Sequence, residues 1–378
     1  MLKWTVRILM FFIILIASLA AVLRYSFGGG QDYPDVSTAP LLPANALVAA
    51  VETQYPVGNT AVSAQGRIFF TVHPESNPSY PKLLEWKDGQ AVPFPDTEKQ
   101  KEILVSPLGV ALDQQNRLWI ADPANHGLDG GRLIALDINT GNVVHQHQFK
   151  PEVASAGSFV QDLQVSSDGK WVYLADVGFW KKQPGLIVYD VEKQQANRVL
   201  NEHSSVYPQN YLVRNQIKPL SFFGGIVEMK AGVDGIALSK DDQWLYYAAM
   251  NHESLFRINT EALRDFSLSA EQLEAQIETV STKPLNDGLS MDSEGNVYVT
   301  DVEHQAIIAV APDGTLSTLI KDPRIRWADG LSFGEDGWLY IADSAIPHLA
   351  LQSQSYIQQQ APYYIWKFKP GPAGVAGQ

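Results

Sequence analysis

The sequence contains no cysteine. The chain therefore forms no disulfide, offers no thiolate to a metal ion and has no cysteine nucleophile. Basic residues are also scarce, because 28 Lys and Arg stand against 41 Asp and Glu, which gives a formal net charge of −13. Nucleic acids and anionic membrane surfaces are bound through clustered Lys and Arg, so we expect neither as a partner of the folded region. The P-loop and the His-Glu-x-x-His helix are missing too, so those phosphate and zinc chemistries are not indicated.

One long hydrophobic run is present, and it lies at the N-terminus. Two basic residues precede residues 8–23, which are apolar except for one serine. This arrangement is typical of a secretory signal or of an uncleaved anchor. Cleavage at the small residues 18–20 and retention, which Arg24 favours, both stay open. We expect the chain beyond about residue 30 to be extracytoplasmic, either periplasmic or secreted, or to be membrane-anchored by residues 4–23.

A repeated pair of strands organises the rest of the chain. In residues 286–301, apolar and polar residues alternate, a Gly-containing turn follows, and Val297-Tyr298-Val299 begins a second strand. The unit recurs at spacings of roughly 40 to 70 residues, the range of blade repeats. Copies begin near residues 61, 109, 162, 234, 287 and 329. Six copies predict an all-β, six-bladed β-propeller.

The repeat also predicts the domain organisation. Hydrophobic residues make up 45% of the chain, which is enough for a large core. We expect residues 47–51 to pair with the last strand, residues 363–368, because such closure removes exposed sheet edges. The expected parts are a signal peptide or anchor (1–24), a linker (25–45), the propeller (46–370) and a flexible C-terminal tail (371–378).

Three local features stand outside the repeat pattern. Residues 202–232 are irregular and aromatic, and loops of this length are usually functional, so the segment is a candidate lid. Ser269 and Gln272 have capping-box spacing, which predicts a short surface helix. The Trp and Tyr residues that recur in second strands are expected to pack between blades.

Acidic residues recur at one end of the repeats. The second strand returns antiparallel to the first, so the start of one and the end of the other share a face. First strands begin at Asp162, Asp234, Asp287 and Asp329, which we expect to ring one mouth of the central channel. Carboxylates converging there repel one another unless a cation, a proton or a cationic ligand neutralises them. Alternatively, Asp-Gly simply caps a tight turn.

A second set of acids ends the second strands on the same face. We expect these residues to hydrogen-bond the following turn, and they are Asp122, Asp176, Asp301 and Asp343. Just beyond three such strand ends lie Asn125-His126, Asn251-His252 and Glu303-His304. The histidines are expected to pack in loops, with a ligand role for Asn251, His252 and His304 as the alternative.

Oxygen ligands without thiolates suit Ca²⁺ or Mg²⁺ better than zinc. A bound cation could polarise a carbonyl while a neighbouring carboxylate acts as base. Asp234 and Asp287 are the candidate catalytic residues for such chemistry. No cofactor follows with certainty from the sequence.

Several stretches together resemble the major royal jelly and yellow protein family. Residues 232–239, followed by Leu245-Tyr246-Tyr247, fit its pattern, as do residues 116–122 and 185–190. The resemblance covers roughly residues 56–368. It implies a secreted six-bladed propeller whose channel holds a small ligand, often an aromatic amine, and members have been linked to dopachrome conversion, an isomerisation.

The wider blade pattern is similar to the SMP-30/gluconolactonase propellers. That resemblance implies a divalent metal held by acid and amide side chains at first-strand starts and by a Glu in the first blade. Asp234 and Asp287 match two of these positions, and Asn59 stands near the expected Glu. The resemblance therefore implies a metal site at Asp234, Asp287 and Asn59, and a lactonase or related hydrolase.

Three functions follow from these patterns. The preferred one is binding of a neutral or cationic small molecule at the Asp-lined mouth. A metal-dependent lactonase is the alternative, and a propeller that binds a protein partner is the third. No nucleic acid partner is expected, and membrane contact is expected only through the N-terminal segment.

Overall fold

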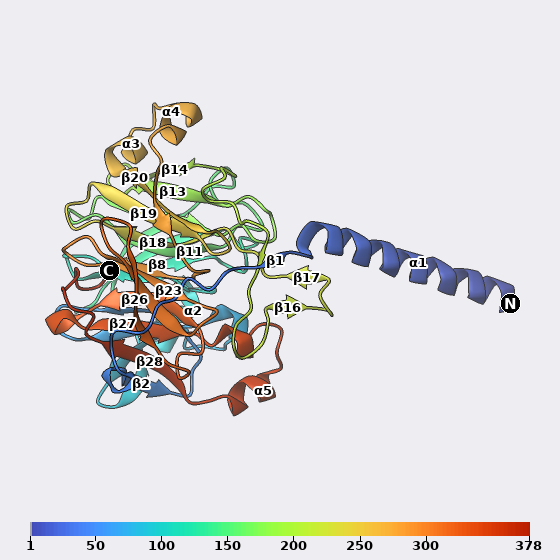
Figure 1. Ribbon diagram of the computed structural model, residues 1–378, viewed down its shortest axis with the longest axis horizontal. Helices are drawn as coiled ribbons and strands as arrows, with labels where there is room; N and C mark the ends of the chain where they lie inside the picture. Colours follow the sequence, from blue (N-terminus) through green and yellow to red (C-terminus); the bar gives the residue numbers. More distant parts are fainter. Residues whose placement is uncertain (1) are drawn as a thin grey trace.

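Six four-stranded antiparallel sheets stand around a central axis in the computed structural model, which describes residues 2–378 (Figure 1). Strands adjacent in sequence pair with each other in every sheet, and the predicted all-β six-bladed propeller is confirmed. Blade one contains β3 (Val57–Val62), β4 (Ile68–Val72), β5 (Leu83–Lys87) and β6 (Gln90–Pro93). Blade two contains β7 (Val110–Leu112), β8 (Arg117–Asp122), β9 (Arg132–Asp137) and β10 (Val143–Gln148). Blade three contains β11 (Val160–Val165), β12 (Trp171–Asp176), β13 (Gly185–Asp190) and β14 (Gln195–Val199).

The second half of the chain builds the other three blades. Blade four contains β18 (Val233–Leu238), β19 (Trp244–Ala249), β20 (Ser254–Asn259) and β21 (Glu278–Thr282). Blade five contains β22 (Leu289–Met291), β23 (Val297–Asp301), β24 (Ala306–Val310) and β25 (Leu316–Lys321). Blade six contains β26 (Ala328–Phe333), β27 (Leu339–Asp343), β28 (Tyr363–Phe368) and β2 (Val48–Thr53). The first strands of blades one, three, four and six are buried along their whole length.

Blade six closes the ring with strands from both ends of the propeller. β2 pairs antiparallel with β28, with Val48 opposite Lys367 and Val51 opposite Ile365. The predicted closure of the propeller is therefore confirmed. With β2, the sixth sheet has four strands like the other five, so its third strand, β28, is paired on both sides.

The aspartate at the end of a first strand holds the hairpin turn that follows. Asp292 accepts the backbone N–H of Asn296 at 3.0 Å and the hydroxyl of Tyr298 at 2.7 Å. In blade two, Asp113 accepts the indole N–H of Trp119 at 2.8 Å. Both aromatic rings are buried. Trp119 packs against blade three and Tyr298 against Phe333 of blade six, so these aromatics pack between blades, as predicted. Their polar atoms also hold the second strand to its turn.

Residues 371–378, expected to be a flexible tail, are instead bonded to the inner strands. Leu112 donates its N–H to the carbonyl of Gly377 at 2.9 Å, and Phe333 donates to that of Gln378 at 2.8 Å. The side-chain amide of Gln378 donates to the carbonyl of Val165 at 2.9 Å. First strands have a free inner edge whose backbone groups need partners, and the tail supplies them. It crosses the end of the channel opposite the aspartate mouth.

Helix α1 (Leu2–Phe27) projects from the propeller (Figure 1). Within it, Trp4–Phe27 is long and apolar enough to cross a membrane, and none of its apolar 18-residue stretch is buried against the protein. A signal sequence would meet the same criteria. The following segment is ordered, since β1 (Gln31–Asp32) pairs in parallel with β15 (Tyr211–Leu212) and η1 (Ala44–Ala46) leads into β2.

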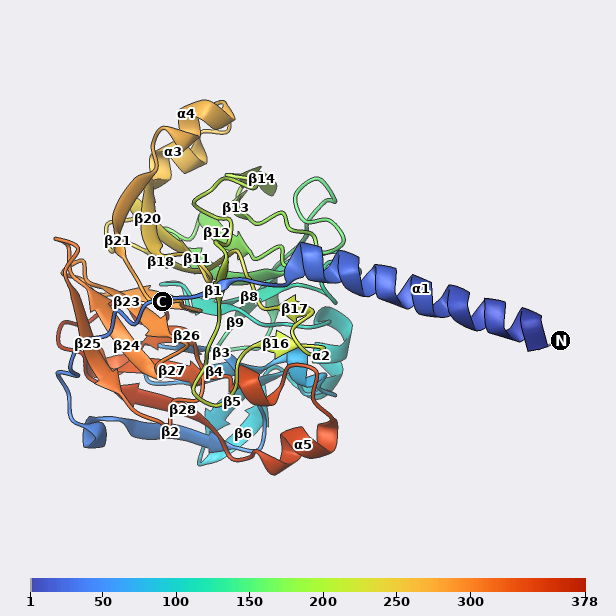
Figure 2. The same cartoon turned by 45° about the vertical axis from the view of Figure 1, so that its right-hand side comes forward.

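Insertions between strands add the remaining elements. The candidate lid, residues 202–232, contains β15 and the hairpin of β16 (Ser221–Phe222) and β17 (Val227–Glu228), which lies beside α1 in Figure 2. Helix α4 (Ala270–Glu274) has the predicted capping box at Ser269. The other helical turns are η2 (Pro74–Ser76), α2 (Thr97–Ile103), α3 (Thr260–Arg264), η3 (Glu335–Gly337), η4 (Ile346–His348) and α5 (Gln354–Gln359).

Candidate functional site

A cavity of about 310 Å³ occupies the channel mouth where the first strands begin. Asp234, Asp287 and Asp329 line it together with Gln161 and His73. Apolar and aromatic side chains from the loops and the lid form its walls, and they include Phe159, Val177, Phe179, Trp180, Phe222, Phe223, Met229, Met250, Ile346 and Leu351. Within the described part of the chain, no Lys or Arg lines this cavity. The cavity therefore has an acidic floor and apolar walls.

Two side chains donate hydrogen bonds to Asp287. The indole of Trp327 donates to its Oδ2 at 2.6 Å, and the amide of Gln161 donates to its Oδ1 at 3.2 Å. Burial raises the pKa of Asp287 to about 6, although these donors and a hydrogen bond from Asp234 oppose the rise. Asp287 is thus the carboxyl best prepared to carry a negative charge.

Asp234 is hydrogen-bonded to Asp287, and of the two carboxyls it is the one that keeps its proton. Burial raises its pKa well above the ordinary value, and the negative charges of Asp287, Asp329 and Asp162 raise it further. The hydrogen bond between the two carboxyls raises the pKa of Asp234 and lowers that of Asp287. A buried carboxyl pair shares charge in this way because both groups cannot ionise side by side. Asp234 and Asp287 therefore form a proton-sharing pair.

Asp329 differs from the carboxyl pair in leaving one oxygen unsatisfied. Its Oδ2 is buried and has no hydrogen-bond partner among the residues described. Nε2 of His73 lies 3.8 Å from this oxygen. His73 accepts the N–H of Glu75 at Nδ1, so Nε2 carries the ring proton, and burial lowers the pKa of His73 to about 4. A neutral imidazole leaves the Asp329 carboxyl without a compensating charge, and burial raises its pKa well above the ordinary value.

Asp162 lies behind the cavity rather than in its lining. Its carboxylate accepts the amide of Asn59 at 3.3 Å and the N–H of Ile236 at 3.4 Å. Burial raises its pKa to about 7. The structure thus places three of the four predicted aspartates in the cavity lining and leaves Asp162 outside it.

The other predicted ligand residues do not line the cavity. Asn251 is fully buried, and its amide accepts from Ala231 and donates to two backbone carbonyls. His252 accepts the N–H of Ser254 at 2.9 Å, and His304 bonds Asp301 at 3.0 Å. These side chains hold loops together. Loop packing was the expected role of the histidines, and a ligand role was the alternative.

Three of the four acids that end second strands bond the following turn, as predicted: Asp122 accepts the N–H of Ala124, Asp176 that of Gly178, and Asp301 those of Glu303 and His304. Asp343 instead accepts the N–H groups of Arg326 and Trp327, which precede the first strand of its blade. Asp176 and Asp343 also form buried salt bridges to Arg198 and Arg326.

The predicted metal ligands do not converge as a divalent ion requires. The oxygen of Asn59 accepts the N–H of Thr60 at 2.7 Å, and its nitrogen donates to Asp162. Among the described residues, the group of three acidic or His ligands close enough for one ion is Asp35, Asp301 and His304, outside the channel. Divalent ions need several oxygens on one centre. Because the channel side chains do not fit such an ion, we derive no chemistry from one.

Sequence reasoning missed His73, Glu75, Gln161 and Trp327. His73 follows the second strand of blade one, the weakest repeat, and Glu75 lies 3.4 Å from His126 at the cavity edge. Gln161 directly precedes a predicted aspartate, so its position in the repeat was the available signal. Trp327 precedes Asp329, but its bond to Asp287 joins two blades, and no local pattern reports such a contact.

One further motif has an ordinary explanation. Residues 330–334 read Gly-Leu-Ser-Phe-Gly, the spacing of a serine hydrolase elbow. They lie inside strand β26 and the turn after it, not between a strand and a helix. Ser332 Oγ accepts the N–H of Val62 at 3.1 Å and is buried. Ser332 therefore links blades six and one and is no nucleophile.

Comparison with solved structures shows the same fold at low sequence identity. A luciferin-regenerating enzyme superposes with a TM-score of 0.55 and 13% identity, covering 88% of this chain and 97% of that one. Regucalcin of Agrobacterium tumefaciens, a calcium-binding protein, gives 0.53 and 13%, with 87% and 98% covered. A gluconolactonase of Xanthomonas campestris gives 0.52 and 15%, with 91% and 98% covered.

Sequence relatives come from the honeybee. Major royal jelly protein 9 of Apis mellifera is 26% identical over 180 residues, 44% of this chain and 39% of that protein. Major royal jelly protein 3 is 27% identical over 184 residues, 45% of this chain and 32% of that protein. The chain thus spans about two fifths or less of the length of these relatives. Residues 105–353, about two thirds of the chain, match the family model of the major royal jelly proteins. The chain belongs to the major royal jelly protein family.

Proposed function

We propose that this protein binds a small cationic molecule with an apolar body, such as an aromatic amine, outside the cytoplasm. The observation that carries the proposal is the cavity with three buried carboxyls on its floor and no Lys or Arg in its described lining. Buried charges in proteins are paired or neutralised. A protonated amine would supply the missing positive charge.

The floor can bind an ammonium group through specific atoms. Asp329 Oδ2 is an unpartnered acceptor, and Asp287 already carries two donors that stabilise its ionised form. Hydrogen bonds from an ammonium to carboxylates are about twice as strong as those between neutral groups. Aromatic walls such as Phe159 and Phe179 would cover the apolar body and also attract the cation.

A proton-transfer reaction is the second candidate function. Asp234 keeps its proton while Asp287 is the more acidic partner, so one acid and one base lie side by side at the cavity floor. Such a pair could move a proton between two positions of a bound substrate, as an isomerase does. We do not propose a metal-dependent lactonase, because the channel side chains do not fit a divalent ion.

Calorimetric titration of the full-length protein with phenethylamine tests the proposal. Phenethyl alcohol is the matched neutral probe, because it has the same apolar body and no charge. We expect the amine to bind and the alcohol to bind at least about tenfold more weakly, the equivalent of about 1.4 kcal/mol. Equal binding of the two probes would contradict the proposal.

Variants locate the binding site. Asp329→Asn and Asp287→Asn each remove one potential charge, and we expect each to weaken amine binding by about ten- to a hundredfold. Glu52→Gln is the control, because Glu52 is exposed on β2, away from the cavity. If the two aspartate variants bind the amine as the control does, the ligand lies elsewhere, and a surface for a protein partner becomes the better explanation.

A further inference from the structure

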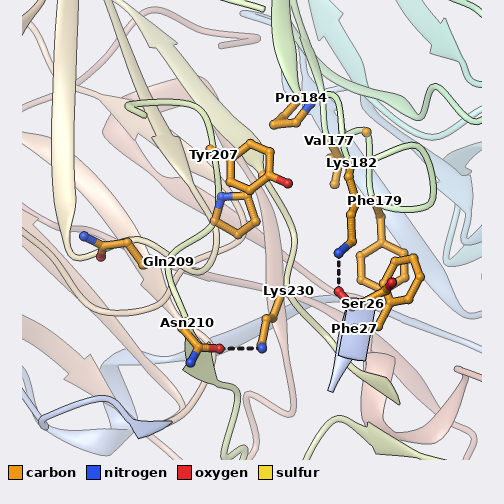
Figure 3. Close-up of a pocket in the computed structure, with 13 residues that line it drawn as sticks. Ser26, Phe27, Val177, Phe179, Lys182, Pro184, Tyr207, Gln209, Asn210 and Lys230 are labelled. Carbon is orange, nitrogen blue, oxygen red and sulfur yellow. Dashed lines mark hydrogen bonds between the residues drawn. The ribbon is translucent and has the colours of Figure 1, made fainter. Parts of the chain in front are cut away.

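The C-terminal end of α1 is fixed against the rim of the acidic cavity. Figure 3 shows Phe27 beside Phe179, with Lys182 donating to the carbonyl of Ser26. The ring of Phe27 lies 5.8 Å from that of Phe179 and 5.9 Å from that of Trp180. Phe179 and Trp180 also line the acidic cavity. The helix therefore ends on the wall of the cavity.

Further contacts hold the helix end to the lid hairpin. Arg24 donates to the carbonyl of Gly225 and lies 4.0 Å from Glu228. Lys230 donates to the carbonyl of Gly28 at 3.2 Å. A side chain at Gly28 would approach the carbonyl of Ile226 to 2.8 Å, so only glycine allows this close approach. The helix end is thus part of the propeller surface and is not joined by a free linker.

The same side of the propeller exposes large apolar side chains. Trp180, Phe223 and Leu351, here called the apolar rim, are 52%, 66% and 65% exposed. They come from three separate loops, yet all three line the acidic cavity. Figures 1 and 2 show α1, the β16–β17 hairpin and the α5 region on one side of the molecule. Exposed apolar clusters of this kind mark surfaces that contact a partner or a membrane.

The length of α1 favours the membrane over a protein partner. The 24 residues Trp4–Phe27 extend about 36 Å, and the hydrocarbon core of a bilayer is about 30 Å thick. A helix that spans this core ends in the headgroup layer, where Trp side chains are enriched. Because Phe27 is fixed beside Trp180, the apolar rim would lie in the same layer.

We infer that the acidic cavity opens onto the membrane surface at which α1 ends, with the apolar rim inserted among the lipid headgroups. The ligand then enters from that layer as an amphiphile, with its amine toward the aspartates and its apolar body along the walls. The ligand class rests on the proposed function, whereas the position of the rim does not.

Single nitroxide labels on the full-length protein in phosphatidylcholine vesicles test this inference. The chain has no native cysteine, so Phe223→Cys and Leu351→Cys each carry one thiol. Asp313→Cys is the control, on an exposed hairpin turn between β24 and β25 at the opposite end of the propeller. Collision rates with oxygen and with a water-soluble nickel complex then report the depth of each label.

We expect the labels at 223 and 351 to meet oxygen more and nickel less than the label at 313. Three labels with equal access to the nickel complex would overturn the inference, as would release of the intact chain from the vesicles. Repeating the measurement in Asp329→Asn separates the two proposals. That substitution is expected to weaken amine binding and to leave the depth of the rim labels unchanged.

Discussion

At the scale of single residues, the buried carboxyls make the free energy of unfolding depend on pH. Asp162 has a pKa raised to about 7 by burial, and Asp287 has one of about 6. The native state therefore holds protons that an unfolded chain releases near pH 4. By linkage, these groups make the free energy of unfolding fall as pH rises from about 4 to about 7. Ionisation of these buried carboxyls at neutral pH therefore lowers the free energy of unfolding.

Asp162→Asn is expected to stabilise the protein at neutral pH. The amide keeps an acceptor for the N–H of Ile236 and cannot ionise, so the variant should gain about 2 to 4 kcal/mol at pH 8 and much less at pH 4.5. Thermal melting at both pH values measures the difference. A variant that is destabilised equally at both would show that Asp162 is needed for its hydrogen bonds rather than being a buried acid.

At the scale of elements, the strand β2 closes the propeller by pairing with β28 in blade six. Val51 on β2 is 1% exposed and packs in the core between blades six and one, whereas Val48 on the same strand is 42% exposed. Val51→Ala is expected to lower the free energy of unfolding by about 2 kcal/mol, because it leaves a cavity in that core. Val48→Ala should change it by less than about 0.5 kcal/mol. Equal losses in urea unfolding would contradict this account.

The elements also show what a sequence can predict. The blades follow from a local pattern that recurs six times, and the closure by β2 follows from the single apolar run at residues 47–51. The turn role of Asp122, Asp176 and Asp301 follows from their place at the ends of second strands. The cavity walls do not, since Trp180, Phe223 and Leu351 belong to loops of unrelated sequence that meet only in the folded ring. The order of residues 371–378 was missed because the tail bonds to strand edges that only ring closure brings together.

The acidic floor of the cavity could be predicted from the sequence only in part. Its aspartates were predicted because each begins a repeated strand. Their separate roles were not, because each depends on a neighbouring blade. Asn59 of blade one bonds Asp162, Trp327 of blade six bonds Asp287, and His73 of blade one lies 3.8 Å from Asp329 of blade six. The distances between blades depend on the packing of the whole propeller, so no single repeat contains them.

At the scale of the whole molecule, the two ends of the channel differ. Residues 371–378 cross one end, while the other end holds the acidic cavity, the lid hairpin and the end of α1. A net charge of −13 makes binding of the propeller to anionic lipids unfavourable, so contact through the apolar rim depends on α1 and on apolar side chains. The arrangement favours one route for a ligand, through the end that carries the helix.

The pH dependence of amine binding tests the central claim most directly. Only an ionised carboxyl pairs with an ammonium group, and burial raises the pKa of Asp287 to about 6. Calorimetric titration of the full-length protein with phenethylamine should therefore show affinity rising by about tenfold between pH 5 and pH 8, while the amine stays protonated. Affinity that is constant or that falls over this range would contradict an acid-floored site for a cation.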